Sequence, residues 1–194
     1  MKKNICILCV ILTLVLTSNA QNNSKIQSLA GPRLGFVGIT DSRSSLILNG
    51  DLKVFDRIPS QSYYEENVNG AWTSLYGWQF ESRFADGGDV TGIVEWILLA
   101  GGMEKGLFLP SVSSLVGVRN KEGFEFALGP NLSLTGIAMV LGVGYNFNSG
   151  NLNIPINIAF VPGRQVTRVT ETDKDINIKT GNRISITAGF NLSR

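Results

Sequence analysis

Residues 136–163 read GIAMVLGVGYNFNSGNLNIPINIAFVPG, and this stretch decides the fold. Alternate positions in its first half are large and apolar, whereas the positions between them are mostly small or polar. The large residues are Ile137, Met139, Leu141, Val143, Tyr145 and Phe147. A repeat of two is the period of a β-strand, in which successive side chains point to opposite faces. After a plausible tight turn at Ser149-Gly150, the alternation resumes with Leu152, Ile154 and Ile156. The stretch predicts two long antiparallel strands, each with one apolar face.

The same period of two recurs along the rest of the chain. Together with the opening pair, the segments that carry it are 30–40, 71–84, 89–99, 107–119, 122–130, 136–148, 151–161 and 182–193. No segment has the pattern of a long helix. The sequence therefore predicts an all-β protein with eight strands.

The connections between these strands alternate between short and long. Short turns fall at 86–88, 120–123 and 148–151, whereas the other connections are 41–70, 100–106, 131–135 and 162–181. Short turns at one end and longer loops at the other are typical of a transmembrane β-barrel whose two termini lie in the periplasm. The predicted fold class is an eight-stranded antiparallel up-and-down transmembrane β-barrel, with Pro110 and Pro155 expected at bulges because proline lacks an N–H.

The two faces of the strands favour a membrane barrel over a soluble one. One face carries charges and Asn, Ser, Thr and Gly, while the other carries Trp, Phe, Leu, Ile and Val. Large apolar side chains outside and polar ones inside suit a lipid-embedded barrel. Aromatic residues near the short-turn end, such as Phe84, Phe124 and Phe147, resemble an interfacial girdle. The alternative is a soluble exported lipocalin-like barrel that binds a small apolar ligand, with the faces reversed.

The first 20 residues have the pattern of a signal peptide. Lys2 and Lys3 precede an apolar run that ends before the small-residue site Ser18-Asn19-Ala20. That run is shorter than the roughly 20 residues that a membrane-spanning helix needs. We expect cleavage after Ala20, which leaves residues 21–194 as one barrel domain that is exported to the outer membrane.

Composition argues against several classes of function. The chain has no histidine, and both cysteines, Cys6 and Cys9, lie in the expected signal peptide. The usual pairs of nucleophile and base are therefore missing, and we expect no catalytic residues, no metal site and no cofactor. Without Lys2 and Lys3 the 17 basic residues become 15 and balance 15 acidic ones, so nothing indicates a nucleic-acid partner.

Six charged residues fall on the polar face of the expected strands. They are Arg33, Glu81, Arg83, Glu95, Arg119 and Glu125. An eight-stranded barrel is about wide enough for its own side chains, and buried charges need partners. We expect these residues to form a structural charge network in a filled lumen, and a path for ions is the alternative.

The export signal, eight strands, alternating loops and charged interior resemble the small outer-membrane β-barrel proteins of Gram-negative bacteria, of the OmpA-barrel and OmpX type. Gln21 directly after Ser-Asn-Ala also resembles exported proteins of the Bacteroidota. From the lipid-facing aromatic residues we expect a monomer in contact with outer-membrane lipid. The resemblance covers the whole mature chain and rests on architecture more than on any single motif.

The two longest loops are where a binding role is expected. Loop 41–70 contains Asn49-Gly50, which we expect to turn a projecting hairpin, and loop 162–181 is charged and rich in Thr. Both leave the same end of the barrel and become neighbours if the first and last strands pair. The sequence predicts a protein partner at these loops, held by adhesion or strand addition, against the simpler reading of solvated surface loops.

Overall fold

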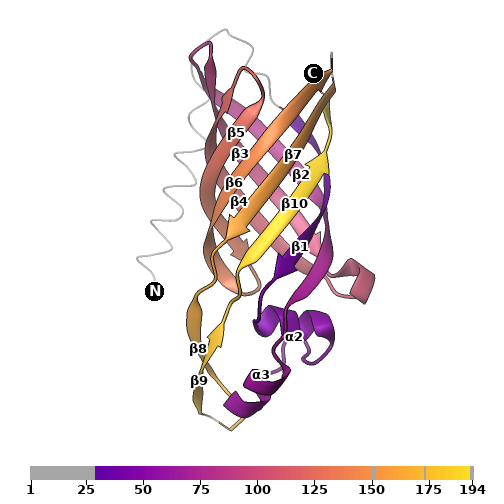
Figure 1. The fold of residues 1–194 in the computed structure, drawn as a ribbon, viewed down its shortest axis with the longest axis vertical. Coiled ribbons are helices and arrows are strands. Elements are labelled where there is room, and N and C mark those ends of the chain that lie inside the picture. The colour runs from indigo at the N-terminus through magenta and orange to yellow at the C-terminus, as the bar shows by residue number, and fades with distance from the viewer. Residues whose placement is uncertain (1–28, 150–151, 173, 193–194) are drawn as a thin grey trace, which may run out of the picture.

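A computed structural model describes residues 29–149, 152–172 and 174–192 of the chain (Figure 1). Its main feature is a tall, tilted sheet that closes on itself. The strands of this sheet are β1 (Leu29–Ile39), β2 (Ala71–Asp86), β3 (Val90–Gly101), β4 (Leu109–Asn120), β5 (Phe124–Ser133), β6 (Gly136–Ser149), β7 (Leu152–Val161), β10 (Arg183–Gly189) and β11 (Asn191–Leu192). The expected signal peptide, residues 1–20, lies outside the described residues.

The sheet is a closed eight-stranded barrel. From β1 to β7 each strand pairs antiparallel with the next, and β10 pairs with both β1 and β7. Only Phe190 separates β10 from β11, and both pair with β7. The two therefore act as one strand, so the nine strands of this sheet in the described residues make eight staves of the barrel. The eight predicted strands and the up-and-down order are confirmed, and the predicted ranges match the observed ones to within a few residues.

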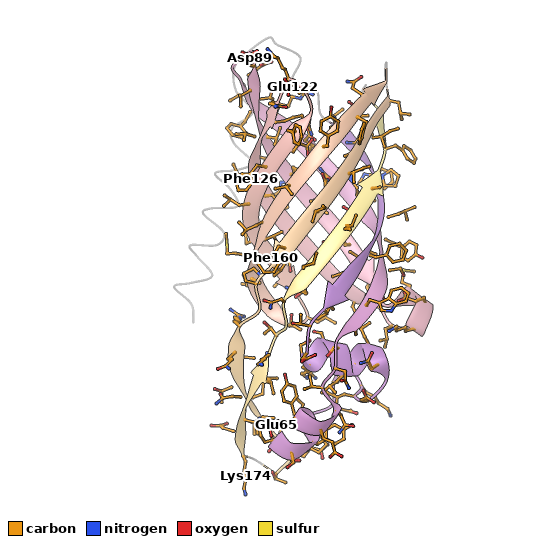
Figure 2. The ribbon with its side chains drawn as sticks, viewed as in Figure 1. Glu65, Asp89, Glu122, Phe126, Phe160 and Lys174 are labelled. Carbon is orange, nitrogen blue, oxygen red and sulfur yellow. The ribbon has the colours of Figure 1, made fainter. Side chains whose placement is uncertain are left out.

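The outer surface of the barrel is apolar around its whole circumference. Phe126 and Phe160 point away from the barrel in Figure 2, and more than a third of each side chain is exposed. Other exposed apolar residues on the strands are Leu34, Phe36, Trp78, Phe80, Leu98, Val116, Leu128, Leu141, Val143, Ile158, Ile184 and Ile186. Soluble proteins rarely expose a continuous apolar area of this extent. The lipocalin-like arrangement, with apolar side chains inside and polar ones outside, does not fit this surface.

Aromatic side chains lie toward both ends of this surface. At the end with the short turns, here the turn end, Phe124 packs edge-on against Tyr145 and Tyr145 against Phe147, with ring centroids 4.9 and 4.6 Å apart. Toward the opposite end, here the loop end, Phe36 lies beside Trp72 at 6.2 Å. The aromatic cluster predicted at the turn end is confirmed as a set of outward side chains.

The expected bulges at Pro110 and Pro155 are wrong. Pro110 pairs with Ala100 and Pro155 with Asn146 in uninterrupted register, and the shift in the β2–β3 ladder falls at Arg83 and Ala85 instead. Pro155 faces the break between β10 and β11, because Ala188–Ile156 and Asn191–Asn153 pair on either side of it. Its missing N–H interrupts the ladder without inserting a residue.

The two longest loops fold into structure of their own at the loop end (Figure 1). Loop 41–70 forms α2 (Arg43–Asn49) and α3 (Gln61–Asn67), and loop 162–181 forms the hairpin of β8 (Gln165–Val169) and β9 (Asp175–Lys179). The hairpin expected at Asn49-Gly50 is wrong. Ser42 begins α2 with a capping box, and Gly50 ends it with φ of 87°. No helix in the described residues is long and apolar enough to cross a membrane.

Candidate functional site

The inward face of the strands brings charged side chains together inside the barrel. Five of the six residues singled out in the sequence are almost completely buried; they are Arg33, Glu81, Glu95, Arg119 and Glu125. They come from β1, β2, β3, β4 and β5, so the charges of five consecutive strands converge in one layer of the lumen.

Arg119 is the centre of this layer. Its Nη1 donates to Glu81 Oε1 at 2.7 Å, and its Nη2 donates to Glu81 Oε2. The same guanidinium contacts Glu125 through Nε and Nη2. A planar guanidinium matches two carboxylates in this way because its five N–H groups point in fixed directions. Arg119 therefore ties β4 to both β2 and β5.

Arg33 reaches Glu95 through an uncharged side chain. Arg33 Nε donates to Gln79 Oε1 at 2.9 Å, and Gln79 Nε2 in turn donates to Glu95 Oε1. Arg33 Nη1 donates to Asn191 Oδ1 at 3.0 Å and to the Pro32 carbonyl at 2.8 Å, whereas its Nη2 has no partner among the described residues. Gln79 and Asn191 were not among the predicted site residues, although their alternation with Glu81 and Gly189 places them on the inward face.

Arg83 does not join the layer. It is half-buried, its buried Nε has no partner in the described structure, and it lines a cavity of about 450 Å³ at the turn end. Arg119, Asn146 and Asn153 line the same cavity. The structure therefore brings together five of the six predicted residues and leaves Arg83 on the turn-end side.

The other half of the lumen is hollow. A cavity of about 670 Å³ lies between the charged layer and the folded loops, with Glu95 and Glu125 at its inner limit. Arg119 lines only the turn-end cavity, so the charged layer separates the two spaces. The expectation of a filled lumen is thus wrong for the loop-end half. Small side chains on the inward face, such as Gly142, Ala159 and Ser185, leave this half open.

The folded loops at the mouth of this cavity share one apolar core, which we call the loop subdomain (residues 41–70 and 162–181). Leu46, Ile47 and Tyr64 from the first loop pack against Ile176 and Ile178 from the second. The backbone N–H of Lys179 also donates to the Tyr64 hydroxyl at 3.1 Å. The expectation that the two longest loops lie side by side is confirmed.

A third connection is fixed to the barrel rim by a carboxylate. Glu104, in the short helix η1 (Met103–Lys105), accepts hydrogen bonds from the hydroxyls of Ser74 and Thr73. The Ser74 N–H donates to it as well, at 3.3 Å. These donors favour the ionised carboxylate and lower the pKa of Glu104 to about 2.

Metal ligands are not gathered anywhere in the described residues, where no group of three or more Asp and Glu side chains has the spacing of a metal site. The charged layer is built from guanidinium, carboxylate and amide groups that bond to one another. These bonds connect strands of the barrel through the lumen, and the layer that they form separates the two cavities.

No protein-family model matches the chain, and no curated protein sequence does. Among solved structures, one that is similar to this chain is the solid-state NMR structure of outer membrane protein AlkL in DMPC lipid bilayers. The match has a TM-score of 0.49 and 7% sequence identity, and it covers 91% of this chain and 94% of the other.

Proposed function

We propose that this chain is a non-enzymatic barrel protein of the bacterial outer membrane, monomeric, with the loop end outside the cell. The observation that carries the proposal is the apolar outer surface of a closed barrel. Every backbone group inside a bilayer must find a partner within the protein, and a closed barrel meets that demand. Its full-length strands of 10 to 16 residues reach the roughly 9–11 residues that a tilted strand needs to cross.

The binding role that we propose belongs to the loop subdomain. β8 and β9 form a two-stranded sheet, so each strand has one edge without a β partner in the described residues. Ile176 and Ile178 face the shared core, while most other side chains of the hairpin are exposed. The edge of β8 suits a protein partner that adds a strand, because the Lys179 N–H on β9 already donates to Tyr64 of α3.

The proposed role is non-enzymatic, and the composition of the chain supports this part of the proposal. The chain has no histidine, and its two cysteines lie in the expected signal peptide. Of the buried carboxylates, Glu81 and Glu125 are bonded to Arg119 and Glu95 to Gln79, so none is placed as a free acid or base. The likeness to barrels of the OmpA and OmpX type remains part of this proposal.

Cell fractionation tests the localisation. We expect the protein in the outer-membrane fraction, resistant to carbonate extraction, and migrating faster on a gel before boiling than after it. Recovery as a soluble protein without detergent would contradict the proposal and would favour the lipocalin-like alternative, which also forecasts binding of an apolar fluorophore.

Loop replacement tests the binding role separately. Replacing 41–70 and 162–181 by tight turns removes the loop subdomain and should leave the barrel heat-modifiable. Crosslinking in native membranes should then lose the partner bands that the full chain shows. Shortening only the β3–β4 connection, residues 102–108, is the matched control, because that loop adds no residue to β8 or β9. An unchanged set of crosslinked partners after removal of the loop subdomain would count against the binding role.

A further inference from the structure

The loop-end cavity has the shape of a binding site inside the barrel. Its volume of about 670 Å³ lies in the range of small-molecule sites, roughly 300–1,000 Å³. Inward side chains from strands around the barrel line it, and serine, threonine and asparagine are outnumbered by aliphatic residues. Examples are Ile39, Leu75, Leu99, Leu109 and Val161. The cavity is therefore part of the lumen and has a mostly apolar wall, with polar side chains such as Ser113, Ser185 and Thr187 in it.

The mouth of this cavity is positively charged. Arg43, Arg57, Arg168 and Arg183 line it, whereas Asp56 is the one carboxylate that lines it away from the charged layer in the described residues. Arg43 donates to the backbone carbonyls of Val54 and Asp56, both at 2.8 Å. Burial and then the neighbouring charge of Arg168 lower the pKa of Arg43, against a smaller opposing effect of the Asp56 carboxylate. Two cations that repel each other at the mouth of a cavity favour an anion between them.

Arg183 adds a third cation at the rim of the barrel wall. Its guanidinium donates to Asn131 Oδ1 at 3.3 Å and to Ser133 Oγ at 3.4 Å, which are long contacts to uncharged groups. Ser133 and Asn131 line the cavity with it. The mouth thus combines cations with hydroxyl and amide groups, while aliphatic side chains make up most of the remaining lining.

We propose that the loop-end cavity binds a single-chain amphiphile with an anionic head group. The head lies at Arg43, Arg168 and Arg183, and the chain extends along the aliphatic lining toward Glu95 and Glu125. At that inner limit Glu125 is bonded to Arg119 and Glu95 to Gln79, so both carboxylates are engaged within the charged layer. A free fatty acid and a lysophospholipid share this chemistry, and the experiment below separates the two sources.

Native mass spectrometry of the folded protein in a neutral detergent counts bound ligands directly. We expect one dodecanoate per protein, and much weaker binding of dodecyltrimethylammonium, which has a similar chain and the opposite charge. A lysophosphatidylglycerol with a 12-carbon chain forms a parallel arm. Binding of either anion supports the proposal and identifies the source, whereas binding of neither overturns it. The titration uses protein from any cell fraction, so its outcome is independent of where the protein resides.

Cavity-filling variants locate the bound chain. Gly142 lines the cavity, and an added Cβ there would meet nothing nearer than the Ala127 carbonyl oxygen at 3.6 Å, so Gly142→Phe has room to project inward. We expect Gly142→Phe to abolish dodecanoate binding. Leu141→Phe is the matched control, because the neighbouring side chain points outward and should leave binding unchanged. Ala159→Phe, whose strand partner is Gly142, provides a second filling variant if the first fails to fold.

Charge variants locate the head group. Replacing Arg168 and Arg183 together by Gln should weaken dodecanoate binding at least about tenfold, which corresponds to the loss of one charged contact. Lys174→Gln removes a cation at the distant tip of the β8–β9 hairpin (Figure 2) and should leave the affinity unchanged. Undiminished binding in Gly142→Phe and Ala159→Phe, or equal binding of the cationic amphiphile, would overturn the proposal.

Discussion

Arg119 on β4 holds both carboxylate oxygens of Glu81 on β2, across the intervening strand β3, with Nη1 2.7 Å from Oε1. The contact joins residues 38 positions apart in the sequence and is buried at both ends. It fixes the distance between two strands that share no backbone hydrogen bonds. Glu125 adds a second carboxylate to the same guanidinium.

Removing Arg119 should therefore destabilise the barrel. In Arg119→Ala the carboxylates of Glu81 and Glu125 stay buried without their cation, which costs about 3–5 kcal/mol in comparable sites. Urea unfolding in detergent, followed by tryptophan fluorescence, measures the difference. Arg83→Ala is the control, since Arg83 makes no ion pair in the described structure and should cost much less. Equal loss in the two variants would show that the ion pairs are not what holds the layer together.

Two glycines on the inward face should respond oppositely to the same substitution. At Gly189, an added Cβ would lie 2.1 Å from the Pro32 carbonyl oxygen and 2.6 Å from Arg33 Nη1, whereas at Gly142 the nearest atom is 3.6 Å away. We expect Gly189→Ala to lower the free energy of unfolding by about 1–3 kcal/mol and Gly142→Ala to be neutral or stabilising. The urea midpoints of the two variants and the wild type measure the difference. A Gly189→Ala variant as stable as the wild type would mean that Pro32 and Arg33 are packed less tightly than the structure shows.

The loop subdomain should unfold without the barrel. Leu46 is fully buried in the core that the two loops share, so Leu46→Ala should cost about 2–5 kcal/mol of local stability. Limited proteolysis should cut within 41–70 faster, while heat-modifiable migration is kept. Leu134→Ala, at a half-exposed position in the β5–β6 turn, should change neither readout. Loss of the folded barrel in Leu46→Ala would show that loops and barrel fold as one unit.

The Glu104 contact should make stability depend on pH. The pKa of Glu104 falls from 4.5 to about 2 because the hydroxyls of Ser74 and Thr73 donate to its carboxylate. A lowered pKa means that the stabilisation is complete above pH 4.5 and is lost as pH falls toward 2. Glu104→Gln should thus be less stable than wild type at pH 6, and the gap should shrink by pH 2.5. The effect is small because Glu104 is exposed.

Glu122→Gln is the control for that comparison, since Glu122 lies in a turn at the opposite end of the barrel (Figure 2). Its difference from wild type should stay the same at both pH values. A gap for Glu104→Gln that is constant between pH 6 and pH 2.5 would assign the contact to neutral hydrogen bonding instead of charge.

The barrel could be predicted because strand alternation is a local signal. Each lipid-facing strand must alternate large apolar and polar side chains with a period of two. A few consecutive residues, such as Glu125 and Phe126, therefore show which face of the strand is polar and which is apolar. Burial of Arg33, Glu81, Glu95, Arg119 and Glu125 followed from the same pattern. Which arginine bonds to which carboxylate could not be predicted from this pattern, because it depends on the stagger between neighbouring strands.

The features missed in the sequence depend on contacts between distant segments. α2 and α3 have seven residues each, too few to show a helical stripe in the sequence. Their apolar side chains pack against distant segments, as Leu46 does against Ile176 and Leu48 against Leu75. The open half of the lumen arises from small residues on separate strands, such as Gly142 and Ser185, which no single segment reveals. Pro155 was misread because its effect depends on which neighbour its nitrogen faces.

Quenching of intrinsic fluorescence by brominated lipid tests the central claim most directly. All three tryptophans of the chain, Trp72, Trp78 and Trp96, lie on the outward face of β2 and β3, so no substitution is needed. If the barrel spans a bilayer, bromine on the acyl chains should quench most of the emission, whereas aqueous acrylamide should quench little. Weak quenching by brominated lipid together with strong quenching by acrylamide would contradict the membrane-spanning barrel.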